Sequence, residues 1–336
     1  MWYNTSNKNS ERNIEMKILK NICCLILAVV TAAGTGCVSL VEKLYPETAA
    51  ESTGTAFVPV DIAEGSVYFK DFDGNEIMLD KAPESVASLS VVSTEILCGL
   101  GAGRYISVIN SSSKEVEGAP IGAAVVDNYC MDAGVIEEAS PDIVFYTVSN
   151  LSVEAASKLR EDGYILIRIP DSGDIAAAEA NIRFISSVMY KDQRGEDLIA
   201  EMRSEIEKIR ILAEFVGVRS TVYIESSNEF CAVGGNSITS ELCGYLGAEN
   251  IFNDKKGTFM TNAEELTRKN PEVIIILTDS PEDFSTDTVR KREGMTDVYA
   301  CRTKNIHAID VRSATRPTQN IVKAMRELSA AFKITK

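Results

Sequence analysis

Few residues in this chain have the chemistry of a catalytic or bare-metal site. His307 is the single histidine among 336 residues, and it falls inside a short run with a strand pattern. A serine hydrolase needs a base, and no Gly-x-Ser-x-Gly turn is present. A zinc or manganese site built mainly from imidazoles would need several histidines. We therefore expect no enzymatic activity, no cofactor and no site for a bare metal ion.

Charge and cysteine usage exclude further classes. The chain has 49 acidic and 34 basic residues, a formal net charge of −15. Such a surface repels phosphate backbones, so nucleic acid is not an expected partner. The cysteines after residue 40 are scattered, without the close spacing of a zinc or disulfide framework, and Cys98 and Cys243 fit buried positions in helical patterns.

The elements that position the remaining residues alternate along 67–173. Two short strands, 67–70 and 76–79, flank Asp73-Gly74 and predict a hairpin. Further strands are predicted at 85–89, 105–109, 142–146 and 164–169, with a helix capped by Ser93 and another over 152–162. Strands that alternate with helices indicate a largely parallel sheet covered on both faces.

The pattern changes at 174 and resumes at 217. Residues 174–216 give only helix signal, and their apolar stripe comprises Leu198, Met202, Ile206, Ile209, Leu212 and Val216. A helix over 195–216 would be roughly 33 Å long. Strands then follow at 220–224, 272–277 and 305–309, and helices at 237–246, 262–269 and from Pro317 onward. We expect an α/β protein of two Rossmann-like lobes with mainly parallel sheets, 67–173 and 217–336, joined by one long helix within 174–216.

The first 66 residues have a different character. Lys17 and Lys20 precede the apolar run 22–30, and small residues lead to Cys37, which is the pattern of a secretory signal. The run is shorter than the about 20 residues of a membrane span. Residues 34–37 resemble the lipobox of bacterial lipoproteins, except that Gly34 replaces the usual aliphatic residue. We expect a signal over 1–36, of which 1–15 are an untranslated extension, then lipidation of Cys37 and a tether over 37–66.

Six segments in order resemble the class III substrate-binding proteins of ABC importers, which include receptors for vitamin B12, haem and ferric siderophores. They lie at 69–79, 83–103, 139–145, 234–254, 262–277 and 316–328. The resemblance runs from about residue 67 to the C-terminus. It implies two lobes that face each other and a modest closing motion around the long helix.

Ligands of open α/β sheets lie beyond the carboxyl ends of the strands, so the loops after the strands are expected in the cleft. The candidate ligand contacts from these loops are Ser93, Thr94, Asn150, Asn228, Phe230, Arg312 and Arg316. The two arginines suit a carboxylate or phosphate, with surface ion pairing as the alternative. The resemblance adds Tyr129, with sheet-edge packing as its alternative, and Met131 as a ligand of haem iron, with a core position as its alternative.

The same resemblance implies docking to a permease through one exposed glutamate on each lobe. In the second lobe the matching residue is Glu264. In the first lobe the matching position is Gly134, so the contact would move to Glu137 or Glu138 on the same helix, with solvated helix charge as the alternative for all three.

Taken as a sequence, the chain is expected to be a monomeric, lipid-anchored extracytoplasmic binding protein. It would capture a ferric siderophore, haem or vitamin B12 and deliver it to the permease of an ABC importer. The alternatives are an envelope lipoprotein that keeps the fold for adhesion or sensing, and a cryptic enzyme. A metallic ligand would arrive already chelated, because the imidazoles needed for a bare ion are missing.

Overall fold

The computed structural model describes residues 66–128, 133–226 and 229–334, all within one compact unit, Thr55–Lys336. The predicted signal, Cys37 and most of the tether lie outside the described residues. No helix in the described part of the chain is both long and apolar enough to cross a lipid bilayer.

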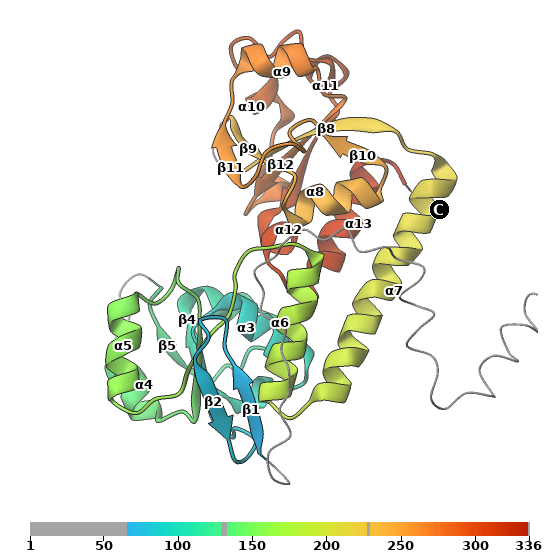
Figure 1. Ribbon diagram of the computed structural model, residues 1–336. Helices are drawn as coiled ribbons and strands as arrows, with labels where there is room; N and C mark the ends of the chain where they lie inside the picture. Colours follow the sequence, from blue (N-terminus) through green and yellow to red (C-terminus); the bar gives the residue numbers. More distant parts are fainter. Residues whose placement is uncertain (1–65, 129–132, 227–228, 335–336) are drawn as a thin grey trace, which may run out of the picture. The chain divides into compact units, whose positions relative to one another are not determined.

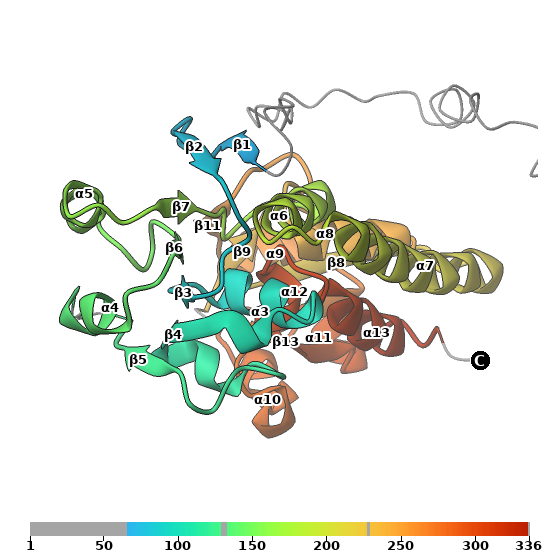
Figure 2. The same ribbon diagram turned by 90° about the horizontal axis from the view of Figure 1, so that it is seen from below.

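Lobe 1 is built on a five-stranded, wholly parallel sheet in the order β5-β4-β3-β6-β7. The strands are β3 (Val86–Ser88), β4 (Ile106–Asn110), β5 (Ala124–Val126), β6 (Ile143–Tyr146) and β7 (Leu166–Arg168). Helices α4 (Ala133–Ala139) and α5 (Val153–Glu161) cover one face, and α3 (Val91–Gly99) and α6 (Ile175–Val188) the other (Figure 2). The parallel sheet predicted for this half is confirmed.

The predicted hairpin at the start of the lobe is also confirmed. Strands β1 (Val67–Lys70) and β2 (Glu76–Leu79) pair antiparallel. Asp71 closes the turn, because its Oδ1 accepts hydrogen bonds from the backbone N–H groups of Asp73 and Asn75 at 2.9 and 2.8 Å. Gly74 has a φ of 81°, a value at which a side chain would be strained. The Phe69 ring then packs edge-on against Phe184 of α6, with centroids 5.3 Å apart.

Two helices occupy the predicted interlobe segment (Figure 1). Helix α6 ends at Val188, and α7 (Asp192–Val216) begins four residues later, three residues earlier than the predicted start at 195. With 25 residues, α7 is about 37 Å long. It packs against α6 on one side and α13 (Ile321–Ala331) of lobe 2 on the other. Its predicted stripe is buried at Leu198, Met202 and Ile206, but Val216 at the helix end is exposed.

Lobe 2 has a mixed sheet in the order β11-β9-β8-β12-β13. Its strands are β8 (Ser220–Glu225), β9 (Cys231–Val233), β10 (Ala248–Asn250), β11 (Thr258–Met260), β12 (Val273–Thr278) and β13 (Ile306–Asp310). The predicted strands at 220–224, 272–277 and 305–309 form the parallel centre, which β10 joins. Strands β9 and β11 add an antiparallel edge that the sequence patterns did not predict.

Helices cover both faces of the lobe 2 sheet. Helices α8 (Ile238–Tyr245), α12 (Val311–Thr315) and α13 share one core with the α6–α7 pair. Helices α9 (Ala263–Lys269), α10 (Thr286–Arg290) and α11 (Tyr299–Thr303) surround a separate core on the other face. The first of these cores is continuous with the α3–α6 side of lobe 1, so buried apolar side chains connect both lobes through α6 and α7.

Two predicted helix starts were wrong. Helix α3 is capped by Ser90, whose Oγ accepts the Val92 N–H at 3.2 Å, so Ser93 lies inside the helix. Helix α13 begins at Ile321, not at Pro317. Thr318 and Gln319, which lie between Pro317 and Ile321, donate hydrogen bonds to Glu95 of lobe 1. This tertiary contact overrides the preference of proline for the first helical position. Ser237, by contrast, caps α8 as the pattern indicated.

Candidate functional site

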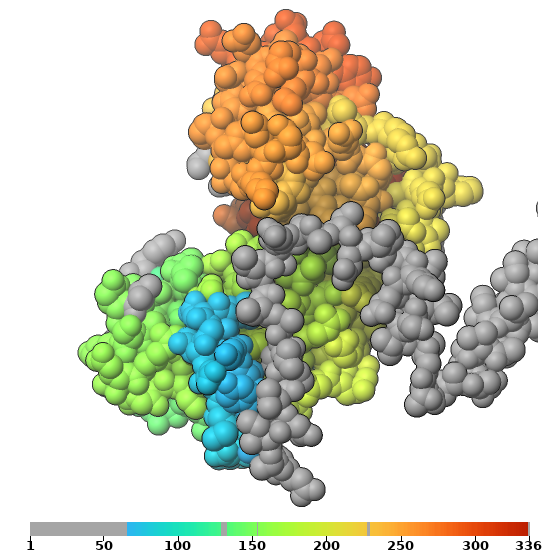
Figure 3. Space-filling model, viewed as in Figure 1, coloured from blue at the N-terminus to red at the C-terminus, as the bar shows by residue number. Residues whose placement is uncertain are grey.

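A pocket of about 650 Å³ lies between the lobes, and we call it the interlobe pocket. In Figure 3 the outline of the molecule narrows between lobe 1 (blue to green) and lobe 2 (orange to red). The lining from lobe 1 comprises Glu95, Cys98, Gly99, Ser112, Glu115, Val116, Glu117 and Gly118. The lining from lobe 2 comprises Asp310, Arg312, Ser313, Arg316, Gln319, Asn320 and Lys323.

Strand ends supply several of these residues. Ser112 and Glu115 lie in the 3₁₀ turn that follows β4, and Arg312 and Ser313 lie in α12, which follows β13. The pocket therefore includes the carboxyl-end loops of both sheets, which is where open α/β sheets bind their ligands. Of the strand-end loops expected in the cleft, only the loop after β4 and the segment after β13 contribute lining residues.

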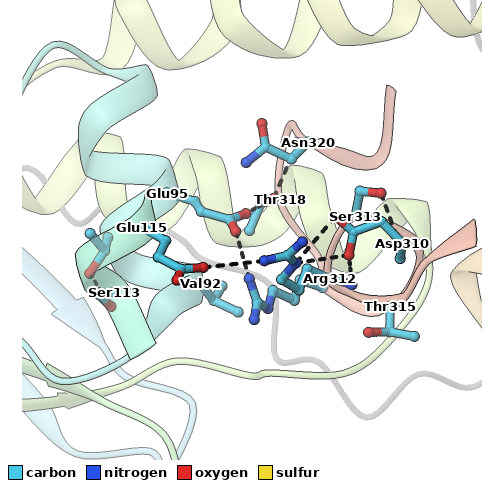
Figure 4. Close-up of polar contacts among 12 residues, drawn as sticks. Val92, Glu95, Ser113, Glu115, Asp310, Arg312, Ser313, Thr315, Thr318 and Asn320 are labelled. Atoms are coloured by element: carbon cyan, nitrogen blue, oxygen red, sulfur yellow. Dashed lines mark hydrogen bonds and ion pairs between the residues drawn. The ribbon is translucent and has the colours of Figure 1, made fainter. Parts of the chain in front are cut away.

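Arg312 bridges the two lobes at the pocket edge (Figure 4). Its Nε donates to Asp310 Oδ1 at 2.9 Å, and its Nη1 lies 3.3 Å from Glu115 Oε2 of lobe 1. The hydrogen bond to Asp310 raises the pKa of Arg312, so the guanidinium stays charged. The side chain remains 40% exposed, and Glu115 is 84% exposed. Water screens such a pair strongly, so the contact is weak and easily exchanged.

Arg316 makes a more buried interlobe contact. Its Nη1 donates to Glu95 Oε1 at 3.0 Å, and Thr318 Oγ1 donates to Glu95 Oε2 at 2.6 Å. Gln319 Nε2 donates to the Glu95 backbone oxygen at 2.8 Å. The Glu95 side chain is only 7% exposed, so this carboxylate is a fixed joint between α3 and the segment 316–319. Both predicted arginines line the pocket, but each is paired with carboxylates, as the ion-pair alternative expected.

Ser93 and Thr94 do not line the interlobe pocket. Both are fully buried, and Ser88 Oγ lies 2.7 Å from Ser93 Oγ and 2.8 Å from Thr94 Oγ1. Thr94 Oγ1 also donates to Ser113 Oγ at 3.1 Å. Because α3 starts at Val91, the first turn of the helix directs these hydroxyls into a network beneath the strand ends. We therefore leave them out of the candidate site.

The other predicted contacts are separated. Asn150 follows β6, where its Oδ1 accepts from Thr147 Oγ1 at 2.6 Å, and it does not line the interlobe pocket. Phe230 lines a second pocket of about 700 Å³ on lobe 2, together with Arg292. Tyr129, Met131 and Asn228 lie outside the described residues.

The residues predicted for docking are accessible. Glu264 is exposed in the first turn of α9, and Glu137 and Glu138 are exposed on α4, as is Gly134. Each lobe thus presents at least one carboxylate on a helix at its surface.

Burial explains the ionisation of the remaining reactive groups. It raises the pKa of the Cys98 thiol to about 11, with a further contribution from Glu95, and that of Cys243 to about 12. Burial also lowers the pKa of His307, and the nearby Lys333 adds to this effect. Near pH 7 these thiols are therefore protonated and the imidazole is neutral, as expected of buried side chains.

Sequence reasoning missed two buried carboxylates, Glu95, which lines the interlobe pocket, and Glu225, which ends β8. Glu95 and Glu225 are each a lone acidic residue in or at the end of an otherwise apolar run, "EILCGL" and "VYIE". A carboxylate in a buried run must be paired, so this signal was available. Its partners, Arg316 and Arg292, are 221 and 67 residues away in the chain and could not be assigned without the tertiary structure.

Residues 86–312 match the periplasmic binding protein family, so the chain belongs to this family. A vitamin B12-binding protein of Vibrio campbellii is 23% identical over 255 residues, which cover 74% of this chain and 89% of that protein.

Solved structures share the fold. A possible iron-binding (periplasmic solute-binding) protein from Staphylococcus epidermidis is 21% identical with a TM-score of 0.69, covering 75% of this chain and 99% of that one. A periplasmic heme-binding protein from Roseiflexus is 23% identical with a TM-score of 0.65, covering 74% and 97%. The predicted class III substrate-binding protein and its two-lobed α/β fold are thereby confirmed.

Proposed function

We propose that this chain is the extracytoplasmic, lipid-anchored binding protein of an ABC importer, and that it carries a ferric siderophore, haem or vitamin B12. The observation that carries the proposal is the interlobe pocket, to which strand-end loops of both lobes contribute. A ligand that touches both lobes stabilises the arrangement in which they are close, because only that arrangement offers all of its contacts. Family membership and the named ligands of its relatives favour the same class.

Polar groups at the pocket edge suit a ligand that is exchanged rather than held permanently. The exposed Arg312–Glu115 pair contributes about 0–1 kcal/mol, so an anionic ligand group can replace Glu115 at little cost. The buried Glu95 joint would stay in place during that exchange, because three groups of the segment 316–319 hold it.

A thermal-shift screen of the mature protein tests the ligand class. The probes are cyanocobalamin, haemin, a ferric trihydroxamate and a ferric tricatecholate. A ligand at a hundred times its dissociation constant should stabilise the protein by about 2.7 kcal/mol. If none of the four shifts the transition, the proposed ligand class is contradicted.

Delivery is proposed to use Glu264 on lobe 2, and Glu137 or Glu138 on lobe 1, as contacts for basic residues of the permease. Glu264→Arg should abolish most uptake in a reconstituted importer without changing the dissociation constant for the ligand. Glu282→Arg, another exposed carboxylate of lobe 2, is the matched control and should leave uptake intact.

Anchoring is proposed to occur at Cys37. Cys37→Ser should release the protein from the membrane fraction of its host, and intact mass of the wild-type protein should show a diacylglyceryl-modified Cys37 as the first residue. A wild-type mass that retains residues 1–36 without lipid would contradict the anchor.

A further inference from the structure

The last turns of helix α7 expose large apolar side chains. Ile211 is 54% exposed, Phe215 88% and Val216 48%, whereas Met202, earlier on the same helix, is buried. Ile211 and Phe215 are four positions apart, so they lie on the same side of the helix. Single exposed apolar residues are common, but a group of large ones marks a contact surface. We call Ile211, Phe215 and Val216 the α7 tip.

The α7 tip lies at the margin of the molecule. Figures 1 and 2 both place the end of α7 on the opposite side from α4 and α5. In the space-filling view this end (yellow) projects beside lobe 2 (Figure 3). Gly217 then ends the helix with a φ of 73°, and the chain turns back into β8. A projecting helix end of this kind is accessible to a broad, flat partner.

The charges near the α7 tip suit an anionic surface, although the whole chain is acidic. Arg210 Nε lies 2.6 Å from Glu207 Oε2 and its Nη1 3.3 Å from Glu214 Oε2, so both carboxylates have a counter-charge. Arg219 is exposed, and its Nη1 donates to the Val218 oxygen at 2.8 Å. It makes no ion pair with a carboxylate in the described part of the chain. Its guanidinium is therefore available to a phosphate group.

The proposed lipid anchor would keep a bilayer within reach of this surface. Residues 38–65 separate Cys37 from Ser66, the first described residue. At about 3.3 Å per residue this segment spans roughly 90 Å when extended, more than twice the length of α7. Such a tether raises the local concentration of lipid around the protein but does not orient it. The orientation depends on which part of the protein surface makes the most favourable contact with lipid.

We propose that the α7 tip, together with Arg219, is a bilayer contact that orients the anchored protein on the membrane surface. The apolar side chains enter the boundary between headgroups and acyl chains, and Arg219 pairs with a lipid phosphate. The inference rests on the anchor in the proposed function. Since α4 lies on the opposite side of the molecule, this orientation differs from the one that docks through Glu137 or Glu138, and the α7 tip leaves the bilayer during docking.

A single tryptophan placed in the α7 tip tests this contact. The only tryptophan of the chain, Trp2, falls in the predicted signal, so the mature protein has none. The lipidated Phe215→Trp variant is reconstituted in phosphatidylcholine–phosphatidylglycerol vesicles with or without a doxyl-labelled lipid, and the label should quench most of its emission. Adding Ile211→Ser should weaken insertion about tenfold and restore most of the emission. Adding Arg219→Gln should restore part of it, because the phosphate contact is lost.

Met260→Trp is the matched control. Met260 is 68% exposed on β11, an edge strand of lobe 2 that lies away from α7 in Figures 1 and 2. The labelled lipid should leave its emission unchanged. Circular dichroism verifies that each variant is folded, and flotation with the vesicles verifies that each is anchored.

The outcomes separate the bilayer contact from the anchor. Equal quenching at positions 215 and 260, or none at 215 in protein that floats with the vesicles, overturns the contact and leaves the anchor and the importer role standing. A blue-shifted but unquenched emission at 215 shows that protein covers the α7 tip, either a second copy or the tether, and also overturns the contact. Wild-type protein that does not float with the vesicles overturns the contact together with the anchor.

Discussion

At the scale of the residue, two buried carboxylates, Glu95 and Glu225, each hold an arginine that lies far away in the sequence. Glu95 accepts a hydrogen bond from Arg316 and one from Thr318, and Glu225 accepts hydrogen bonds from Arg292. A buried carboxylate that loses its partner costs far more than an exposed one, because water cannot replace the lost contact. Arg316 and Arg292 are therefore each fixed in position by a buried carboxylate.

Glu95→Gln should lower the free energy of unfolding by about 1–3 kcal/mol, because it leaves a partly buried Arg316 without its counter-charge. Urea unfolding followed by circular dichroism measures the change. Glu117→Gln is the control, since this exposed carboxylate lines the same pocket and should change stability by less than about 0.5 kcal/mol. Equal effects of the two substitutions would contradict the joint.

Glu241 makes a contact with a predictable pH dependence. Its Oε2 accepts the Ile175 N–H at the start of α6 at 2.9 Å, and burial raises its pKa above the usual value of 4.5. A carboxyl whose pKa is raised on folding destabilises the protein as pH rises from its unfolded to its folded pKa. Glu241→Gln should therefore be more stable relative to wild type at pH 7 than at pH 4. The opposite order in urea unfolding at the two pH values would refute this account.

At the scale of the element, the α6–α7 pair is the part that brings the lobes together. The helices approach so closely that a Cβ on Gly195 would lie 2.2 Å from Ser186 Oγ and 2.6 Å from its Cβ. Helix α7 then continues to α13, and surface ion pairs such as Arg326–Glu205 lie along that contact. The close crossing, more than these exposed pairs, sets the distance between the helices.

Gly195→Ala should therefore destabilise the protein by about 1–3 kcal/mol, despite the better helix propensity of alanine. The matched control is Gly244→Ala in α8, where an added Cβ has no atom within 4 Å. That change should be neutral or stabilise by up to about 1 kcal/mol. Thermal unfolding of both variants shows whether close packing or helix propensity determines the change in stability at Gly195. A stabilised Gly195→Ala variant would show that the helices can separate freely.

At the scale of the whole molecule, the large sheets of the two lobes share one of the three buried cores in the described part of the chain. Buried side chains from lobe 1, α6, α7 and lobe 2 make a single cluster, which includes Ile96, Ile182, Met202, Val222 and Met325. A continuous core couples the unfolding of its parts, so the lobes should not behave as independent domains. Ligand exchange would then involve small movements at the pocket edge.

Calorimetry of the mature protein should accordingly show one unfolding transition, with equal calorimetric and van't Hoff enthalpies. Glu95→Gln should shift this transition without splitting it, because the shared core remains. Two resolved transitions in the wild-type protein would contradict the coupling of the lobes.

The amino-acid sequence alone determined the order of the central parallel strands, the hairpin around Gly74, the cap of α8 at Ser237 and the helical segment that became α6 and α7. These features depend on contacts between residues close in the chain, which leave a period or a turn signal. Only the tertiary structure decided the antiparallel edge of lobe 2, the start of α13 and the pairing of Glu95 with Arg316 and of Glu225 with Arg292. Strands β9 and β11 have only three residues each, too few to show an alternating pattern. The start of α13 and the two ion pairs depend on groups 67 to 224 positions apart, whose attraction acts only after folding has removed water and brought them within hydrogen-bond distance.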